Sequence, residues 1–318
     1  MLDSRWFANS NFRRMWVLQT LDTVSRRTFL KTASSFSFPL FSTEQAPRFL
    51  TNREIEVTRH TVTLRNLPPA FDGLRVVHLT DIHHSKYVSF NAVYRMVALA
   101  NRQRPDMVFL TGDYVTWSKK YIAPMADALR DLRARYGVFG VLGNHDIRVD
   151  AEAVTQALRR VGIQVLRNAS ARVDRRGQTL WLSGVDEYSY GQSDLARAFE
   201  GLPATTPKIL LAHNPEIIAN ATEHQVDFVA AGHTHGGQVK LPGLKSLNSL
   251  TQPTQEFLEG FVSSGRTQMY ISRGLGKVVL PLRIKCPAEI PVYTFRSSRI
   301  ESLTIESLVH CPQSSMIQ

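Results

Sequence analysis

The chain has 318 residues, which allows two average domains or one large α/β enzyme, and 43% of them are hydrophobic, enough for a sizeable core. Its formal net charge of +11 favours anionic partners, such as phosphate esters or an anionic membrane surface. No helix-turn-helix spacing, zinc-finger spacing or basic-aromatic repeat accompanies this charge, so we expect no nucleic-acid partner.

The N-terminal segment contains an arginine pair, followed at fixed offsets by an aromatic residue, a leucine and a lysine, in Ser25-Arg26-Arg27-Thr28-Phe29-Leu30-Lys31. It resembles a twin-arginine export signal, although no clear Ala-x-Ala cleavage site precedes Pro47 and Met15 is an alternative start. The apolar stretch at 32–41 is too short for a membrane span, which takes about 20 residues. We expect residues 1–47 to be a leader and linker, cleaved or uncleaved, that directs export to the periplasm or cell envelope. The alternatives are a disordered basic tail and a cytoplasmic, membrane-associated protein.

From residue 55 onward the sequence has the patterns of an α/β domain. Alternating and continuous apolar runs predict an edge strand at 55–64 and buried strands at 74–80, 106–111 and 138–142. Helix-like apolar spacing predicts helices at 92–103, 121–135 and 151–161. This alternation of strands and helices implies parallel crossover connections.

The second half of the domain is predicted to be richer in strands. Short strands are expected near 164–166, 171–173, 179–185, 208–212 and 226–231. A hairpin and strands at 267–272 and 291–295 follow. We expect the catalytic domain to occupy residues 48–300 and a C-terminal tail to occupy 301–318.

Residues of the types that bind metals stand just after five of these strands. They occur in Asp81-Ile82-His83, Gly112-Asp113, Gly143-Asn144-His145-Asp146, His213-Asn214 and Gly232-His233-Thr234-His235. Open α/β sheets place their active sites at the carboxyl ends of strands, and the glycines beside the last two histidines let the backbone bring both imidazoles together. Each residue alone has an ordinary explanation as a cap, a turn residue or a packed histidine. As a set, they predict a metal centre.

The donor types indicate which chemistry such a centre supports. Cys286 and Cys311 form no Cys-x-x-Cys pair, which argues against a thiolate site and leaves a disulfide between them open. Nitrogen and oxygen donors suit hard to borderline divalent ions, and Asp113 could bridge two of them with its two carboxylate oxygens. Two ions roughly 3.5 to 4 Å apart hold the attacking and leaving oxygens of a phosphoryl transfer and lower the pKa of bound water.

Other polar residues carry weaker expectations. His84 and Tyr114 directly follow a predicted ligand and the predicted bridge, so they either contact substrate or support the ligands. A basic group near the C-terminus is expected to form an ordinary solvated face or else an anion-attracting rim, and it comprises Arg273, Lys277, Arg283 and Lys285.

In this order, the five blocks resemble those of the calcineurin-like metallophosphoesterases, over residues 55–297. The leader and the sequence Ser272-Arg273-Gly274-Leu275-Gly276 resemble the exported bacterial YkuE/YaeI-type phosphodiesterases in particular. The resemblance implies a four-layer α-β-β-α sandwich with two mixed β-sheets, whereas the strand pattern alone supports only a layered α/β domain. It also implies two divalent ions, one held by Asp81, His83 and His235, the other by Asn144, His213 and His233, with Asp113 bridging them.

By the same resemblance, His145 contacts the scissile phosphate and acts as general acid toward the leaving oxygen, as suits a residue that titrates near neutral pH. Asp146 is expected to orient its imidazole. The implied activity is hydrolysis of a phosphodiester or phosphomonoester by a metal-bound hydroxide at a binuclear site. Manganese, iron and zinc all suit a mixed imidazole and carboxylate site.

Two other functions stay open at this point. One is a UDP-2,3-diacylglucosamine pyrophosphatase of lipid A synthesis, for which residues 241–250 and 278–280 could accommodate acyl chains or could pack as loops. The other is a non-catalytic metal-binding envelope protein, against which His145 and Asp146 argue, because metal storage needs no general acid. The expected partners are a phosphate-ester substrate, for example a phospholipid or a lipid precursor, and the twin-arginine export machinery. Peripheral association of the protein with a membrane is also expected.

Overall fold

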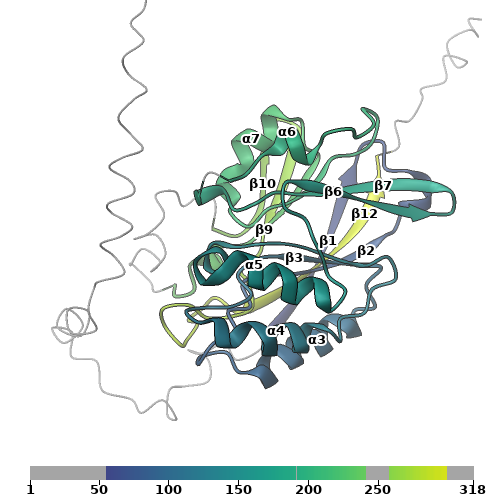
Figure 1. Ribbon diagram of the computed structural model, residues 1–318. Helices are drawn as coiled ribbons and strands as arrows, with labels where there is room; N and C mark the ends of the chain where they lie inside the picture. Colours follow the sequence, from purple (N-terminus) through teal and green to yellow (C-terminus); the bar gives the residue numbers. More distant parts are fainter. Residues whose placement is uncertain (1–54, 191, 241–257, 299–318) are drawn as a thin grey trace, which may run out of the picture. The chain divides into compact units, whose positions relative to one another are not determined.

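The computed structural model describes residues 55–190, 192–240 and 258–298, which fold into two six-stranded mixed sheets (Figure 1). The predicted leader, the C-terminal tail, the apolar stretch at 241–250 and Cys311 lie outside the described residues. The predicted domain boundaries therefore stay predictions.

The first sheet has the order β1-β12-β2-β3-β4-β5. Strands β2 to β5 run parallel, while β12 is antiparallel to β2 and parallel to the edge strand β1. The strands are β1 (Ile55–Leu64), β2 (Arg75–Leu79), β3 (Met107–Thr111), β4 (Val138–Val141), β5 (Gln164–Val165) and β12 (Ala288–Ser297). The predicted edge strand and the parallel crossovers are confirmed.

The second sheet has the order β10-β11-β9-β8-β7-β6. Its four central strands, β11, β9, β8 and β7, run parallel, and an antiparallel hairpin partner closes each edge. The strands are β6 (Ala169–Arg175), β7 (Gln178–Gly184), β8 (Ile209–Leu211), β9 (Phe228–Ala231), β10 (Gly260–Ser264) and β11 (Thr267–Ile271).

Helices cover the outer face of each sheet, α3 to α5 on the first and α6 with α7 on the second (Figure 1). The helices are α3 (Phe90–Arg102), α4 (Ile122–Leu129), α5 (Asn144–Arg160), α6 (Leu195–Ala198) and α7 (Ile218–Glu223). Short 3-10 turns occur at η1 (Pro69–Phe71), η2 (Lys119–Tyr121), η3 (Tyr188–Tyr190), η4 (Pro215–Ile217) and η5 (His235–Gly237). None of the helices in the described ranges combines the length and hydrophobicity that a membrane crossing requires.

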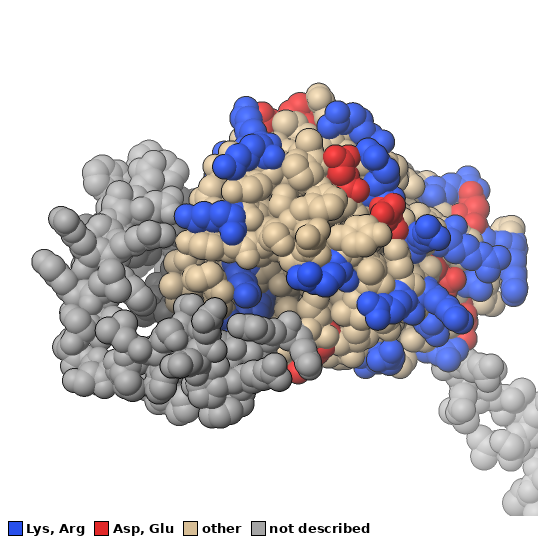
Figure 2. All heavy atoms as spheres, turned by 90° about the horizontal axis from the view of Figure 1, so that it is seen from below, with Lys and Arg blue, Asp and Glu red and all other residues tan. Residues whose placement is uncertain are grey.

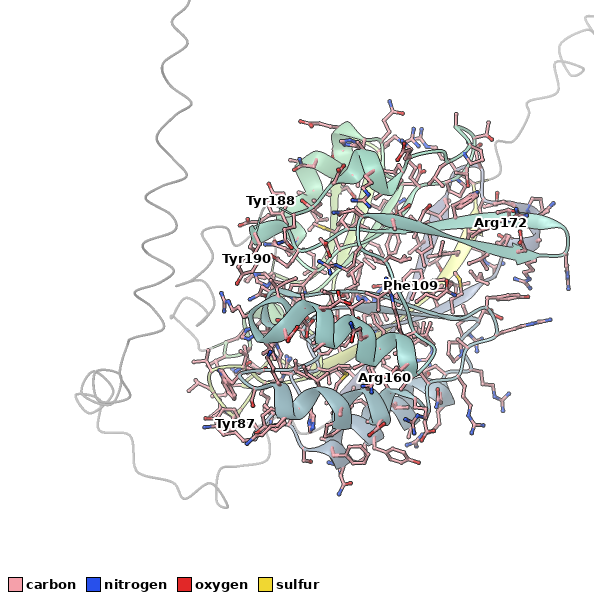
Figure 3. All side chains as sticks on the ribbon, in the orientation of Figure 1. Tyr87, Phe109, Arg160, Arg172, Tyr188 and Tyr190 are labelled. Carbon is pink, nitrogen blue, oxygen red and sulfur yellow. The ribbon has the colours of Figure 1, made fainter. Side chains whose placement is uncertain are left out.

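Three separate apolar cores hold these layers together. Alternate residues of β3 explain the arrangement: Val108 and Leu110 pack toward α3 and α4, whereas Phe109 points between the sheets (Figure 3). A third core lies between the second sheet and its helices α6 and α7. Because both faces of each sheet are buried, central strands such as β3, β8 and β9 consist mainly of apolar residues, as parallel strands usually do. The predicted four-layer α-β-β-α sandwich is confirmed.

Two helix boundaries differ from the prediction. Helix α4 ends at Leu129 rather than 135, since the side chain of Asn101 hydrogen-bonds Asp131 O at 2.7 Å and Arg133 N at 2.9 Å and thereby stabilises a non-helical segment. Helix α5 begins at Asn144 rather than 151. The apolar spacing that predicts this helix begins only after Asp150, where the backbone is extended and interrupts the helix. The Asp150 carboxylate caps the second part of the helix by accepting a hydrogen bond from Ala153 N.

One face of the described part of the chain is predominantly basic. The face covered by α3 and α4 carries more Lys and Arg than Asp and Glu (Figure 2). This agrees with the excess of 38 basic over 27 acidic residues in the whole sequence.

A buried histidine lies in the layer between the sheets. His78 Nδ1 lies 2.8 Å from the Tyr293 hydroxyl, and its Nε2 lies 2.7 Å from Thr111 Oγ1. Burial lowers the pKa of His78 from 6.5 to about 4. The unfolded chain therefore takes up a proton at a higher pH than the folded protein. Stability from this group is complete above pH 6.5 and is lost as the pH falls toward 4.

Replacing His78 by Gln should remove this pH dependence. The free energy of unfolding of the unmodified protein should exceed that of His78→Gln most at neutral pH. The gap should narrow by about 3 kcal/mol as the pH falls to 4, since each unit of pKa displacement is worth about 1.4 kcal/mol. Urea denaturation of both proteins across this range measures the gap. Parallel stability curves would show that His78 does not titrate in this way.

Candidate metal centre

The segments that follow β2, β3, β4, β8 and β9 converge at one end of the two sheets. Three groups of side chains there place their ligand atoms within 4.8 Å of one another: Asp81, His83 and His235; His83, Asp113 and His145; and Asp113, His213 and His233. Asn144 Oδ1 joins them at 3.1 Å from both His213 Nε2 and His233 Nδ1. The structure thus brings together every residue predicted to ligate metal.

Asp113 lies at the middle of this arrangement. Its Oδ2 is 3.4 Å from His83 Nε2 and 3.4 Å from His213 Nε2. Its Oδ1 instead accepts a hydrogen bond from the backbone N–H of His145 at 2.8 Å. A single carboxylate oxygen therefore lies between the two histidine groups, whereas the sequence had suggested that both oxygens would be used.

The geometry around Asp81 suits a cation. His83 Nε2 and His235 Nε2 lie 2.9 Å apart, and Asp81 Oδ1 is 3.3 Å from His235 Nε2. This Oδ1 is buried and accepts no hydrogen bond from the described residues. Converging imidazole nitrogens beside a carboxylate oxygen without a partner are the donor set of a divalent metal site, so the residues present fit such an ion.

Hydrogen bonds at the outer side of the rings fix which nitrogen faces the site. His83 Nδ1 lies 2.6 Å from Thr116 Oγ1, and His213 Nδ1 donates to Thr111 O at 2.7 Å. Thr80 Oγ1 donates to Asp81 Oδ2 at 2.8 Å. Such partners direct the Nε2 atoms of His83 and His213 inward, which is the orientation that metal ligation requires.

The electrostatics of the site favour ionised carboxylates at Asp81 and Asp113. Burial alone would raise the pKa of Asp113, but the nearby His213 and His145 hold it well below its usual range. Burial opposes charge on His213, yet Asp113 raises the pKa of His213 to about 10. Burial lowers the pKa of His233 to about 3 and that of His235 to about 4, so both rings are neutral at pH 7 and can ligate.

Most of the predicted ligands have an unusual backbone conformation. Positive φ angles, rare in residues other than glycine, occur at Asp81 (53°), His83 (51°), Asp113 (55°), His233 (74°) and His235 (54°). Strain of this kind concentrates at functional sites and persists where the surrounding structure enforces it. Glycines provide the space: a Cβ on Gly143 would lie 2.2 Å from Asp113 Oδ1, and one on Gly232 would lie 2.4 Å from Asp81 Oδ2.

Comparison with known proteins agrees with this geometry, since residues 74–237 match the calcineurin-like phosphoesterases. The chain belongs to this family. It is 32% identical over 256 residues to the uncharacterized metallophosphoesterase YkuE of Bacillus subtilis, covering 79% of this chain and 89% of YkuE. It is 29% identical over 220 residues to phosphodiesterase YaeI of Escherichia coli, covering 68% of this chain and 80% of YaeI. Among solved structures, the chain is similar to TT1561 of Thermus thermophilus, with a TM-score of 0.44 and 13% identity. The aligned region covers 67% of this chain and 91% of TT1561.

In this metallophosphoesterase, Asp146 has a different role from the predicted one. Its carboxylate accepts hydrogen bonds from the backbone N–H groups of Asp113 at 2.7 Å and Gly143 at 2.9 Å, and from those of Tyr114 and Val115. Within the described residues, none of its hydrogen bonds reaches the imidazole of His145. Asp146 therefore fixes the two ligand loops to each other, and the prediction that it orients His145 is corrected.

His145 is half-buried beside the ligands. Its ring packs edge-on against that of His83, with centroids 4.9 Å apart. Burial lowers the pKa of His145 to about 4, so the ring is neutral at pH 7 rather than titrating near neutrality as expected from the sequence.

The residues next to the predicted ligands turn out to be structural. Tyr114 is buried and its hydroxyl donates to Val141 O at 2.9 Å, which directs it away from the ligands into the core. His84 Nδ1 donates to Val88 O at 2.8 Å. Among the described residues, both side chains bond backbone carbonyls of the surrounding fold, and neither hydrogen-bonds the side chain of a predicted ligand.

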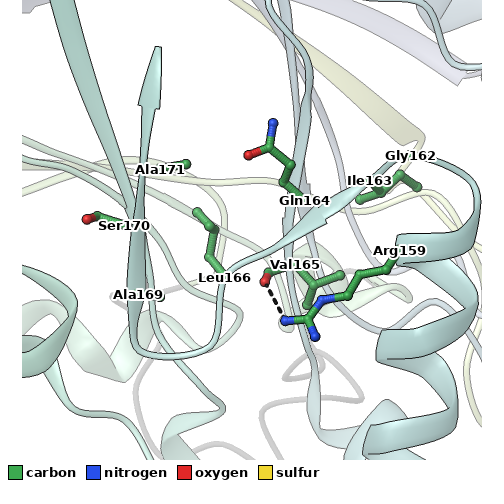
Figure 4. A pocket seen from close by; sticks show the side chains of 9 residues that line it. All are labelled: Arg159, Gly162, Ile163, Gln164, Val165, Leu166, Ala169, Ser170 and Ala171. Carbon is green, nitrogen blue, oxygen red and sulfur yellow. Dashed lines mark hydrogen bonds between the residues drawn. The ribbon is translucent and has the colours of Figure 1, made fainter.

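An open cavity of about 520 Å³ lies elsewhere, at the sheet edges formed by β5 and β6 (Figure 4). It is lined by small and apolar residues together with Gln164 and with Arg159, whose guanidinium donates to Val165 O. None of its lining residues is a predicted ligand, so it is separate from the metal centre.

The sequence does not reveal that Arg283 belongs to the site. It predicts a solvated basic face or an anion-attracting rim, but Arg283 is only 1% exposed. Its guanidinium donates to Arg273 O at 2.8 Å, Gly274 O at 3.1 Å and Gly276 O at 3.0 Å, and it lies 3.3 Å from His235 Nδ1. Arg273 also departs from the prediction, because it is paired with Glu56 and Glu289.

The loop that Arg283 holds is itself bonded to the Asp81 segment. Leu275 N donates to Thr80 O at 3.1 Å, and Gly276 N donates to Asp81 O at 2.6 Å. Arg283 thus joins the segments that carry Asp81 and His235. No local motif marks this residue, because its contacts come from loops distant in the sequence.

Replacing Arg283 by Met should destabilise the protein and weaken metal retention. Several buried carbonyls would lose their donor, at a cost of at least about 3 kcal/mol. Differential scanning fluorimetry and metal analysis of the purified protein measure both effects. Arg130→Met is the matched control, since Arg130 forms an exposed ion pair with Asp127 and its loss should cost about 1 kcal/mol or less. Equal effects of the two changes would contradict the assigned role.

Proposed function

We propose that the protein is a binuclear metal-dependent phosphodiesterase. The observation that carries this proposal is the position of Asp113 Oδ2, 3.4 Å from both His83 Nε2 and His213 Nε2. The name of the E. coli relative, phosphodiesterase YaeI, supports a diester as substrate. One ion would be held by Asp81, His83 and His235, the other by Asn144, His213 and His233, with Asp113 in contact with both.

When bound, such a metal pair activates water and neutralises the charge of a phosphoryl group. The mixed imidazole and carboxylate donors suit manganese, iron or zinc. The chain's own contribution is to hold these donors in place. Asp146 ties the Asp113 and Gly143 loops together, and Thr116 and Thr111 orient His83 and His213.

His145 is the residue in this site that we assign to proton transfer. It stands on the first turn of α5, and its backbone N–H anchors it to Asp113. Its ring is neutral at pH 7 in the free protein, but an anionic phosphate beside it would favour the protonated form. The imidazolium then donates its proton to the oxygen that leaves phosphorus, so that an alcohol rather than an alkoxide departs.

Turnover by the metal-reconstituted protein and its His145→Ala variant tests both the function and this role. A chromogenic diester, an alkyl diester, a chromogenic monoester and the UDP-linked diacylglucosamine should be compared, with manganese, iron and zinc in turn. We expect the diesters to be preferred. His145→Ala should bind metal normally and lose about 10²-fold to 10⁴-fold in kcat on the alkyl diester. It should lose less on the chromogenic diester, because nitrophenolate leaves without protonation.

Several outcomes would contradict the proposal. Turnover of none of the esters with any metal would favour a non-catalytic envelope protein. Preference for the UDP-linked lipid would identify a pyrophosphatase. An equal loss on both diesters would mean that His145 stabilises phosphoryl charge instead of donating a proton.

We also propose that the protein is exported through the twin-arginine pathway. The support is the segment Ser25 to Lys31, which lies outside the described residues. Replacing Arg26 and Arg27 together by Lys should leave the protein in the cytoplasm while its activity persists. Fractionation of cells that express either form measures this, and undiminished export of the variant would exclude the pathway.

A further inference from the structure

Two exposed lysines, an exposed tryptophan and two half-buried tyrosines lie on the loops that follow β2 and β3. They comprise Lys86, Tyr87, Trp117, Lys120 and Tyr121, here called the aromatic-basic patch. The Lys86 ammonium lies 5.0 Å from the ring centroid of Tyr87 and 5.6 Å from that of Trp117, and these two rings meet edge-on. The Lys120 ammonium lies 5.1 Å from the ring centroid of Tyr121. Trp117 is 52% exposed, which is unusual for so large an apolar side chain.

The patch is rigidly attached to the metal centre. The two loops are joined by hydrogen bonds from His83 N to Asp113 O and from His84 N to Tyr114 O, both at 2.9 Å. Trp117 directly follows Thr116, whose hydroxyl contacts the ring of His83. In Figure 3, Tyr87 lies toward the same end of the molecule as Tyr188 and Tyr190, opposite Arg172.

A third loop beside these two exposes another apolar residue. Gly276 N donates to Asp81 O, so the loop that contains Val279 borders the Asp81 segment. Val279 is 68% exposed. Trp117 and Val279 have φ angles of 66° and 60°, a conformation that is costly for bulky or β-branched residues. The fold therefore accepts strain at two positions that present apolar side chains to solvent around the metal centre.

The lysines in these loops are not accompanied by acidic residues. Residues 82–90 and 114–121 contain Lys86, Lys119 and Lys120 but neither Asp nor Glu. Lys119 is paired with Asp150 from α5, which leaves Lys86 and Lys120 stacked on aromatic rings as the cations of the patch. Trp and Tyr rings interleaved with lysines are the side chains that bind the interface of an anionic membrane, where rings enter the headgroup layer and ammonium groups meet phosphates.

We propose that the aromatic-basic patch docks the protein onto an anionic lipid surface, with the metal centre facing the headgroups. The proposal that the protein docks on lipid is supported by the patch alone. The purpose of docking, which is to present lipid phosphodiesters to the metal centre, rests on the proposed function. An apolar partner protein fits less well, because the lysines would be desolvated, whereas headgroup phosphates would pair with them.

Binding of the full chain to lipid vesicles tests the proposal. Vesicles of phosphatidylglycerol and phosphatidylcholine in equal amounts should bind the protein more tightly than vesicles of phosphatidylcholine alone. The Lys86→Gln and Lys120→Gln double variant should lose about 30-fold in partition coefficient on the anionic vesicles, since each cation near such a surface is worth about fivefold. Trp117→Ser should lose about tenfold. Turnover of a soluble chromogenic ester should be unchanged in these variants, so failure of docking and failure of the catalytic proposal are distinguishable.

Matched controls remove two positive charges, or one aromatic ring, from surfaces outside the aromatic-basic patch. The Arg172→Gln and Arg176→Gln double variant loses two exposed cations from the hairpin of β6 and β7, and Phe261→Ser loses an exposed ring of β10. Both should bind anionic vesicles nearly as well as the unmodified chain. Brominated lipid gives a second readout that does not depend on total affinity. It should quench part of the tryptophan fluorescence of the unmodified protein, and this quenching should be lost in Trp117→Phe.

The proposal is overturned if patch and control variants bind anionic vesicles equally and Trp117→Phe leaves the quenching unchanged. It is also overturned if binding is to a soluble polyanion, such as polyphosphate, and not to vesicles. A rise in KM for the soluble ester in Trp117→Ser, without loss of vesicle binding, would instead make the ring a substrate contact.

Discussion

The structure depends on the burial of two carboxylates, Asp81 and Asp113, among five imidazoles at the joined carboxyl ends of two sheets. Removing so many titratable groups from water is costly unless each is paired. Here the negative oxygens face the imidazole nitrogens at 3.3 to 3.4 Å, and a divalent cation would satisfy both kinds of donor together. The central requirement of the fold is to hold these groups close despite that cost.

The surrounding features all serve this requirement. Glycines at 143 and 232 let the backbone approach the carboxylates, and five candidate ligands adopt positive φ angles. The buried Asp146 accepts hydrogen bonds from four backbone amides of two loops. Arg283 performs the equivalent task for the loops around Asp81 and His235. A four-layer sandwich suits this arrangement because its two sheets supply ligand loops from both sides while three apolar cores supply the stability.

Much of the fold and the convergence of the candidate ligands could be predicted from the sequence, and the reasons are physical. Buried strands such as β3 and β9 are continuous apolar runs that end abruptly in polar residues, so strand and site signals reinforce each other. The role of Asp146 could not be predicted, because its partners are backbone amides, which leave no trace in residue identity. The start of α5 was missed since Gly-Asn-His-Asp has the composition of a loop. Arg283 was misplaced because an arginine is expected to be exposed, and only tertiary structure shows the carbonyls that surround it.

The central claim is that Asp113 lies between two metal ions, and metal stoichiometry tests it most directly. Native mass spectrometry of protein reconstituted with manganese or zinc should show two ions per chain in the unmodified protein and in Asp127→Ala, which removes an exposed carboxylate that forms an ion pair with Arg130. Asp113→Ala should bind fewer ions and bind them more weakly, because neither position keeps its shared oxygen. Two tightly bound ions in Asp113→Ala, or a single ion in the unmodified protein, would contradict the account.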